Sequence, residues 1–403
     1  MNSILYKLSQ EEVWLEYLNY KLDKDHLVKK EKEELIEFVN LKKYEEVADL
    51  ILNGDGLTIP EKKLINKIGS NKKRIVYSFK DAENKALKLI AYLLYKYDSR
   101  QSPNCFSFRK GFGAHTAINK ITNTLDISKM WCYKLDIHNY FNSISIPLLL
   151  PILRSVVDDD DLLYEFMKEV LLENKAYYEG TVIEENRGVM AGTPISPFLA
   201  NIYLKEIDEY FFNSNVLYAR YSDDIILFAK TKEELLEYKR IMYEFLDKYD
   251  LVVNPEKEKI TVPLEEWEFL GVSYKCGKID LSLATKNKLK GKIRRKARSL
   301  RRWKIKKNAT DNQTMKVMIK IYNRKFFESS SSTELTWGRW FFPLLNTEEG
   351  LREIDDYLQK YIRYIPCGCH SKKNYKTKYS DLKGLGYKSL VNEYYKYKKQ
   401  KLR

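Results

Sequence analysis

The chain has 403 residues, with 71 Lys and Arg against 56 Asp and Glu and a formal net charge of +15. This length exceeds the roughly 250 to 300 residues at which one hydrophobic core stops growing, so we expect two or three subdomains. Hydrophobic residues make up 44% and aromatic residues 13%, which excludes a disordered polycation. The positive charge predicts attraction to polyanions, either nucleic acid or an anionic membrane surface.

The sequence shows neither a membrane span nor a disulfide framework. No stretch reaches the eighteen or so uninterrupted apolar residues of a membrane span, and residues 1–10 lack the pattern of a signal peptide. We therefore expect a cytoplasmic protein without membrane contact. The five cysteines are scattered and odd in number. Cys367, Cys369 and His370 form a local cluster, but a zinc site is disfavoured there because no second pair of ligands lies nearby in sequence.

The predicted elements begin with helices. Apolar residues recur at helical spacing through the first sixty residues, which indicates an N-terminal helical layer. Residues 71–79 predict a turn that leads into a short strand, and residues 87–97 predict a helix.

The middle of the chain alternates strands and helices. We expect a strand over residues 130–136 and two strands around a polar turn over residues 217–229. Helices are predicted over residues 161–173, from Pro197 onward, and over residues 233–249. This order indicates an α+β sheet with helices packed on one face.

Two basic segments follow. Residues 286–307 hold 13 Lys and Arg and no acid, around an apolar stripe at helical spacing. This pattern predicts a helix that docks on a core while presenting cations, although membrane-surface and calmodulin-binding helices share it. Residues 360–403 mix 13 cations with eight tyrosines. That mixture suits stacking on single-stranded RNA, and a helical cap with half-buried tyrosines explains it equally well.

Three aspartates occur where acids are normally rare. Asp136 closes an apolar strand, and Asp223 and Asp224 lie at the centre of another apolar stretch. Taken alone, a tight hairpin turn explains the Asp pair. Close carboxylates are costly to bury unless a cation neutralises them, and three of them suit Mg²⁺. Two such ions would support nucleotidyl transfer.

These aspartates lie within five ordered motifs that resemble those of reverse transcriptases. Tyr221-Ser222-Asp223-Asp224 resembles the YxDD box, and residues 134–144 resemble the first palm motif. Residues 188–201 are similar to the motif between them. Residues 251–257 and 269–272 resemble the motifs that complete the palm and its grip on the primer. The resemblance covers roughly residues 67–274.

The resemblance implies a right-hand polymerase fold of the α+β class, with helical fingers, a ferredoxin-like palm, a helical thumb and a basic helical C-terminal extension. The corresponding segments are an N-terminal helical segment (1–60), fingers (61–128), a palm with an interleaved fingers segment (129–280), a thumb (281–334) and the extension (335–403).

The resemblance also implies a catalytic site. Asp136, Asp223 and Asp224 match the metal-binding carboxylates, and the backbone carbonyl of Ile137 is a further ligand. Two Mg²⁺ ions are implied, with Mn²⁺ as a substitute. Lys257 matches the lysine that protonates the leaving pyrophosphate, although it is one of many surface lysines.

Other positions match the dNTP site of the family. Phe141 corresponds to the bulky residue that excludes a 2′-hydroxyl, against the alternative of a core aromatic residue. Lys67 and Arg74 match cations that contact the triphosphate, and either could instead be a solvated loop cation. Ala191 and Gly192 belong to the same pocket. Ala191 stands where many relatives have Gln, and Glu258 replaces the usual Thr or Ser.

Nucleic-acid contacts are predicted in three segments. Residues 106–113 fall where related enzymes have a segment that lines the template. The primer grip corresponds to residues 269–271, and the basic helix to a thumb helix that follows duplex phosphates without reading sequence. The predicted contact residues are Arg109, Lys110, Phe269, Leu270, Gly271, Arg294, Arg295, Arg298, Arg301 and Arg302.

The resemblance therefore implies an RNA-directed DNA polymerase that makes cDNA from dNTPs on an RNA template. The compact size, the residues around Ala191 and the Lys/Tyr tail most resemble the defence-associated bacterial enzymes of the "unknown groups". That likeness implies anti-phage defence, a dedicated non-coding RNA, and a homo-oligomer or companion protein. One alternative is a retron-type enzyme that makes a branched RNA–DNA hybrid. An alternative of another class is a catalytically silent RNA-binding protein that has kept the fold.

Overall fold

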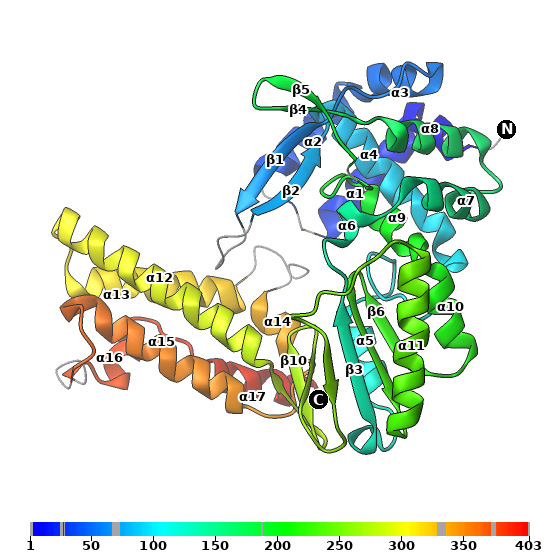
Figure 1. Ribbon diagram of the computed structural model, residues 1–403. Helices are drawn as coiled ribbons and strands as arrows, with labels where there is room; N and C mark the ends of the chain where they lie inside the picture. The colour runs from blue at the N-terminus through cyan, green and yellow to red at the C-terminus, as the bar shows by residue number, and fades with distance from the viewer. Residues whose placement is uncertain are drawn as a thin grey trace. The chain divides into compact units, whose positions relative to one another are not determined.

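The computed structural model describes residues 3–24, 27, 29–66, 73–186, 188–328, 336–371 and 376–401. The chain forms two compact units, Met1–Glu265 (unit 1) and Glu266–Arg403 (unit 2). Figure 1 shows helices and strands in both units, which confirms the α+β class. In the part of the chain that is described, no helix is both long and apolar enough to cross a membrane.

Unit 1 begins with the predicted helical layer. Trp14 is fully buried at its centre, with its ring 5.4 Å from that of Phe38 and 5.3 Å from that of Tyr44. These apolar residues recur at helical spacing, so each helix turns one apolar face inward. The helices of this layer are α1 (Glu11–Lys24), α2 (Lys29–Asn40), α3 (Tyr44–Asn53) and α4 (Asp81–Leu93).

A second part of unit 1 is a four-stranded sheet in the region assigned to the fingers. Its strand order is β2-β1-β4-β5, and β1 and β2 pair antiparallel. Only β2 is predicted from the sequence, because β1 and β5 are exposed along most of their length and lack an apolar alternation. The strands are β1 (Glu61–Asn66), β2 (Lys73–Ser78), β4 (Lys175–Tyr178) and β5 (Thr181–Glu184).

The central sheet of unit 1 has the order β6-β7-β3-β8, and each adjacent pair is antiparallel. Helices lie between β3 and β6 and between β7 and β8 along the chain, which gives the β-α-β-β-α-β order of a ferredoxin-like palm. Figure 1 shows α10 and α11 side by side against this sheet. The elements are β3 (Trp131–Asp136), α9 (Ser196–Tyr203), α10 (Lys205–Asn213), β6 (Leu217–Tyr221), β7 (Asp224–Ala229), α11 (Lys232–Lys248) and β8 (Lys259–Thr261).

Further helices of unit 1 surround these sheets. The helix α7 packs on α8 and α9, and α5 packs on β6. The short helix α6 follows β3 directly. Their bounds are α5 (Ala114–Thr122), α6 (Tyr140–Ser143), α7 (Ile146–Val156) and α8 (Asp161–Leu172).

Unit 2 combines a small sheet, in the order β11-β10-β9, with helices. The long basic helix α12 buries Leu289, Ile293, Ala297 and Leu300, the stripe predicted from the sequence. It packs on α15 and α13. The elements are β9 (Trp267–Phe269), β10 (Val272–Lys275), β11 (Lys278–Leu281), α12 (Leu283–Lys307), α13 (Asp311–Phe327), α14 (Trp337–Phe341), α15 (Glu349–Cys367), α16 (Tyr379–Gly384) and α17 (Leu390–Lys401).

The tyrosines of the basic tail are partly structural. Tyr387 and Tyr394 are buried, and the Tyr387 hydroxyl donates a hydrogen bond of 2.7 Å to the buried carboxylate of Asp355. The backbone N–H groups of Leu390 and Val391 donate to the same carboxylate, which anchors the start of α17. Tyr379 and Tyr395 remain exposed. The tail is therefore a helical cap in which some tyrosine rings face solvent.

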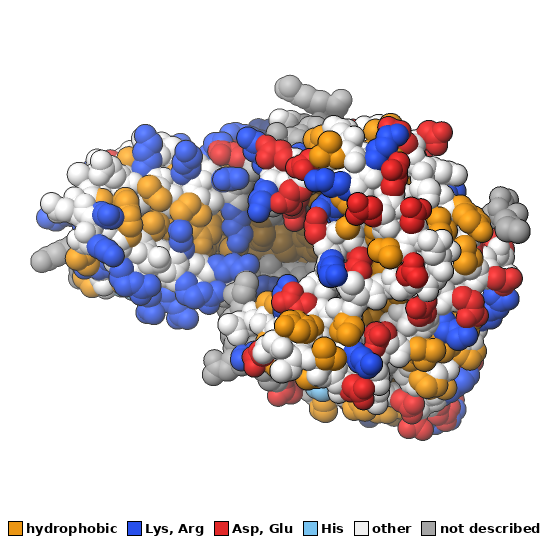
Figure 2. Space-filling view, turned by 90° about the horizontal axis from the view of Figure 1, so that it is seen from above, with side chains coloured by type: hydrophobic (Ala, Val, Ile, Leu, Met, Phe, Trp, Pro, Cys, Tyr) orange, Lys and Arg blue, Asp and Glu red, His pale blue; other side chains and the backbone are white. Residues whose placement is uncertain are grey.

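The two units differ in charge. Unit 2 contains 34 Lys and Arg against 13 Asp and Glu, a net charge of +21, which leaves unit 1 at −6. Figure 2 shows Lys and Arg gathered over the basic helices of unit 2, whereas Asp and Glu are frequent on unit 1. The positive charge of the chain is therefore concentrated in unit 2.

Candidate active site

The three predicted aspartates lie together at one end of the palm sheet. Asp136, the last residue of β3, lies directly opposite Asp224, the first residue of β7. Asp223 lies in the two-residue turn between β6 and β7, and its carbonyl accepts a hydrogen bond of 3.2 Å from the N–H of Ile137. The strand register therefore gathers residues that are almost 90 positions apart in sequence.

The carboxylates influence one another. Asp136 is only 5% exposed. Burial raises the pKa of Asp223 above the ordinary value, and the negative charges of Asp136 and Asp224 raise it further. Such a group of acids needs a compensating positive charge.

Two lysines and an asparagine contact these carboxylates. Nζ of Lys257 lies 2.6 Å from Oδ2 of Asp136, and Nζ of Lys134 lies 3.4 Å from Oδ1 of Asp224. Asn254 donates its backbone N–H to the Asp136 carbonyl at 2.8 Å and its side-chain N–H to Oδ1 at 3.3 Å. The structure thus brings the predicted residue Lys257 to the aspartates through the loop after α11.

The donor atoms at this end of the sheet fit a hard divalent cation in kind. They are three aspartate carboxylates and the adjacent carbonyl of Ile137, and Mg²⁺ takes oxygen ligands of this type. In the conformation described, Lys257 and Lys134 balance two of the carboxylates. Within the described ranges, no set of three or more His, Cys, Asp or Glu side chains is assembled as a metal site. Among the described residues, Cys367, Cys369 and His370 are likewise not assembled as a metal site.

The predicted dNTP residues Phe141, Ala191 and Gly192 lie around one loop, residues 188–195. Its start contacts the chain after β3, because Val189 donates its N–H to the Phe141 carbonyl at 2.9 Å. A Cβ at Gly188 would lie 2.3 Å from the same carbonyl oxygen, so only glycine fits there. The ring of Phe141 is half-buried beside Tyr140, at a centroid distance of 5.8 Å.

The loop also contacts the fingers strand β2. The Ala191 carbonyl accepts a hydrogen bond of 2.8 Å from the N–H of Tyr77, and a Cβ at Gly192 would lie 3.1 Å from Cβ of Val76. Arg74 is exposed two residues before Val76 and therefore lies on the same face of β2. The structure thus orients Arg74 toward the side of the loop. The predicted partner Lys67 lies outside the described residues.

The predicted template residues Arg109 and Lys110 differ in their surroundings. Arg109 is buried, and its guanidinium donates hydrogen bonds to the carbonyls of Ser102, Cys105 and Asp98 and stacks 4.1 Å from the ring centroid of Phe112. These bonds give Arg109 a role in holding the loop. Lys110 is exposed. Contact with nucleic acid stays a prediction for both, and only Lys110 is accessible for it.

The predicted primer grip is a tight turn in unit 2. Phe269 is fully buried, and Leu270 and Gly271 connect β9 to β10 with φ values of 47° and 88°. The Gly271 carbonyl accepts hydrogen bonds from the N–H of Ser282 at 3.0 Å and the hydroxyl of Thr285 at 2.9 Å. The turn is thereby fixed to the start of α12, with Phe269 as a core residue.

The five predicted arginines of α12 fall into two groups. Arg301 is half-buried and donates to the carbonyls of Ile365 and Pro366 at 3.1 and 3.0 Å, at the C-terminal end of α15. Its guanidinium therefore caps a helix. The remaining arginines are exposed and suit phosphate contact, namely Arg294, Arg295, Arg298 and Arg302.

Glu258, which replaces the usual Thr or Ser, bonds to side chains of the palm. Its carboxylate accepts hydrogen bonds from the hydroxyls of Tyr133 at 2.7 Å and Tyr243 at 3.0 Å, and it lies 2.7 Å from Nζ of Lys239. These groups connect β3 with α11. Glu258 therefore stabilises the palm on the helical side of the sheet.

A group of buried residues that the sequence does not predict lies behind the aspartates. The fully buried Arg220 of β6 forms an ion pair with Asp208 of α10 and contacts Asn201, while Ser107 bonds to the turn that carries Asp223. A charged residue within an apolar strand, two positions before the turn, is the one signal that could have indicated this group.

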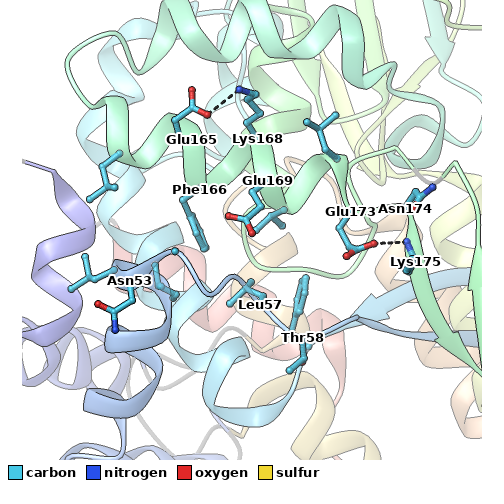
Figure 3. A pocket seen from close by; sticks show the side chains of 17 residues that line it. Asn53, Leu57, Thr58, Glu165, Phe166, Lys168, Glu169, Glu173, Asn174 and Lys175 are labelled. Carbon is cyan, nitrogen blue, oxygen red and sulfur yellow. Dashed lines mark hydrogen bonds and ion pairs between the residues drawn. The ribbon is translucent and has the colours of Figure 1, made fainter.

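A separate hollow of about 780 Å³ lies between α3, α8 and Phe79. Figure 3 shows the Glu165–Lys168 pair on its rim and Phe166 and Leu57 lining it. None of the predicted site residues lines this hollow.

Known proteins resemble this chain in sequence. The family model for "Reverse transcriptase (RNA-dependent DNA polymerase)" matches residues 59–274. The Group II intron-encoded protein LtrA of Lactococcus lactis subsp. cremoris is 29% identical over 162 residues, which cover 40% of this chain and 25% of LtrA. The Retron Ec86 reverse transcriptase of Escherichia coli is 23% identical over 191 residues, which cover 46% of this chain and 55% of that protein.

Among solved structures, an apo telomerase from Candida tropicalis, truncated from the C-terminal domain, has a TM-score of 0.45, with 15% identity over 58% of each chain. The matched part spans a quarter of LtrA and about half of the Ec86 enzyme. The family match includes more than half of the chain and all three aspartates. The chain therefore belongs to the reverse transcriptase (RNA-dependent DNA polymerase) family.

Proposed function

We propose that this protein is an RNA-directed DNA polymerase that extends a primer with dNTPs on an RNA template. The observation that carries the proposal is the register that sets Asp136 opposite Asp224 with Asp223 in the adjoining turn. Few structural roles require three aspartates at one partly buried strand end, because their mutual repulsion opposes folding. A polymerase needs such a group for divalent cations.

Asp136, Asp223, Asp224 and the Ile137 carbonyl would hold two Mg²⁺ ions, or Mn²⁺ in their place. Bound ions would supply charge neutralisation for phosphoryl transfer and would lower the pKa of the attacking hydroxyl. Lys257 and Lys134 would exchange their contacts with Asp136 and Asp224 when cations bind. Lys257 would then be able to donate its proton to the leaving pyrophosphate.

The other side chains select and orient the nucleotide. Arg74 would donate to phosphate oxygens from the strand that contacts the Ala191–Gly192 loop. Phe141 would close the space next to the sugar 2′ position. Gly188 lets the loop approach the backbone of Phe141 closely, which holds this residue in place.

Incorporation of dNTPs by the double variant Asp223→Ala with Asp224→Ala tests the proposal. We expect no incorporation with Mg²⁺ or Mn²⁺, while circular dichroism and RNA binding stay those of the wild type. Unchanged incorporation by this variant would contradict the site. Absence of incorporation by the wild-type chain under all metal conditions would favour a catalytically silent RNA-binding protein.

For the biological role, we propose anti-phage defence with a dedicated non-coding RNA as template or scaffold. The Lys/Tyr tail and the cationic surface of unit 2 support this proposal. The similarity to the Retron Ec86 reverse transcriptase supports a second candidate, a retron-type enzyme that makes a branched RNA–DNA hybrid. Sequencing the nucleic acid that copurifies with the chain separates the two. A branched hybrid indicates the retron type, and a repetitive or homopolymeric cDNA indicates the defence enzyme.

A further inference from the structure

A fully buried ion pair lies behind the turn that carries Asp223. Arg220 and Asp208 are both 0% exposed. Nε of Arg220 lies 2.9 Å from Oδ1 of Asp208, and Nη2 lies 2.5 Å from Oδ2. The Tyr218 hydroxyl donates to Oδ1 at 2.8 Å, so both carboxylate oxygens have partners. A buried pair of this kind adds little net stability over apolar residues, so its role follows from the groups that it holds in place.

The rest of the guanidinium reaches three other segments. Nη1 of Arg220 donates to the carbonyl of Ser222 at 3.3 Å, and Nη2 donates to the Asn201 carbonyl at 2.9 Å and to Sγ of Cys105 at 3.3 Å. Arg220 therefore connects the helices α9 and α10 with the turn. An apolar side chain could fill this space, but it could not bind the Ser222 carbonyl.

Ser107 bonds to the other backbone group of Ser222, its N–H. Its Oγ accepts a hydrogen bond of 2.9 Å from the N–H of Ser222 and donates one of 2.9 Å to Oδ1 of Asn201. The amide of Asn201 in turn donates to the Ser107 carbonyl at 2.7 Å and to Oε1 of Gln101 at 3.1 Å. Both backbone polar groups of Ser222 are thus held by buried side chains.

This support matters because Ser222 has a left-handed backbone, with φ 61°. A non-glycine residue adopts this conformation at a cost and keeps it only where its surroundings enforce it. Asp223 is the next residue, so the conformation of Ser222 sets the direction of the Asp223 carboxylate. Among the described residues, these supporting side chains bond to Ser222 and to one another, and none of them donates a hydrogen bond to Asp136, Asp223 or Asp224.

We propose that Ser107, Asn201, Arg220 and Asp208 are positioning residues that fix Ser222 in its left-handed conformation and thereby aim Asp223 for divalent-cation binding. The inference rests on the proposed function, since it assumes that Asp223 is a metal ligand. It assigns to this network an effect on cation affinity that a purely structural network would not have.

Ser107→Ala is the first test variant, because it removes one hydroxyl and leaves the ion pair intact. Ser102→Ala is its matched control, since Ser102 is buried in the same segment but its hydroxyl accepts from the N–H of Asn104 at 3.3 Å, away from the turn. Arg220→Lys is the second variant, which keeps the charge and shortens the reach toward Ser222. Asp208→Asn is avoided because it leaves a buried cation without its counter-charge.

Mn²⁺ binding to the full chain without nucleic acid is measured by electron paramagnetic resonance, alongside thermal unfolding. We expect Ser107→Ala and Arg220→Lys to weaken Mn²⁺ binding about tenfold, and Ser102→Ala to bind as the wild type does. Mn²⁺ affinity equal to that of the control in both variants, even with a lower melting temperature, overturns the inference. The variant Asp223→Ala with Asp224→Ala is measured in parallel. Undiminished Mn²⁺ binding by that variant contradicts the proposed function, and this inference with it.

Discussion

Lys257 places its ammonium nitrogen 2.6 Å from Oδ2 of Asp136, although most of the lysine side chain is exposed and the aspartate is buried. The contact arises because Asn254, three residues earlier, is bonded to the Asp136 backbone. A loop of the palm thus brings the Lys257 ammonium group to the buried Asp136 carboxylate from the solvent side. This arrangement makes the role of Lys257 directly testable.

We expect Lys257→Met to lower single-turnover dNTP incorporation by about 10² or more, the usual contribution of a general acid. Lys257→Arg keeps the charge but gives up its proton far less readily. Compared with Lys257→Met, it should therefore restore dNTP binding without restoring the rate of incorporation. Lys259→Met, at an exposed lysine of β8, is the control. A rate in Lys257→Met equal to that of this control would assign Lys257 to charge balance alone.

Phe141→Ala tests the sugar gate. Removing the half-buried ring opens the space beside the 2′ position, so we expect the preference for dNTP over rNTP to fall by about tenfold or more. The ratio of kcat/KM for the two nucleotides measures it. His138→Ala, at an exposed position three residues earlier, should leave the ratio unchanged. An unchanged ratio in Phe141→Ala would identify the ring as a core residue.

Gly188→Ala tests the close approach of two backbones. The added Cβ would lie 2.3 Å from the Phe141 carbonyl oxygen, so the free energy of unfolding should fall by about 2 kcal/mol or more. Gly180→Ala is a matched control, since Gly180 also has a positive φ, 89°, but nothing within 4 Å of the added atom. Urea unfolding followed by circular dichroism measures both. Equal losses in the two variants would show that φ alone, and not the contact, requires glycine.

The exposed arginines of α12 test the origin of nucleic-acid affinity. Replacing Arg294, Arg298 and Arg302 by Gln should reduce the slope of log K against log salt concentration by about three, because each phosphate contact releases counterions. Replacing Lys29, Lys30 and Lys32 of α2 by Gln changes the net charge equally in unit 1. Filter binding to an RNA duplex over a salt series separates these sets. A slope that falls equally in both would indicate a non-specific effect of net charge.

The sequence predicted the palm well because its pattern is strong. β3 and the hairpin of β6 and β7 are buried apolar strands, and the aspartates mark their ends. β1 and β5 were missed since exposed strands carry no alternation of apolar residues.

Side-chain partners were harder to predict than strands. Ser107 and Ser222 are 115 positions apart, and no local pattern connects them. The sequence does not show that Arg109 and Arg301 also bond to backbone carbonyls, because a motif cannot distinguish a cation that contacts phosphate from one that caps carbonyl groups. Only the fold determines which arginines remain accessible.

The rates at which the five cysteines react with a thiol reagent report how often the palm opens locally. Cys276, Cys367 and Cys369 are exposed, whereas Cys105 and Cys132 are buried in the central region of unit 1. Burial raises the pKa of the Cys105 thiol, so the small thiolate fraction adds to its protection. A thiol reagent should therefore modify three sulfurs rapidly and two slowly. Because Cys105 contacts Arg220, the rate at its sulfur reports how often the support behind the turn that carries Asp223 loosens in the folded chain.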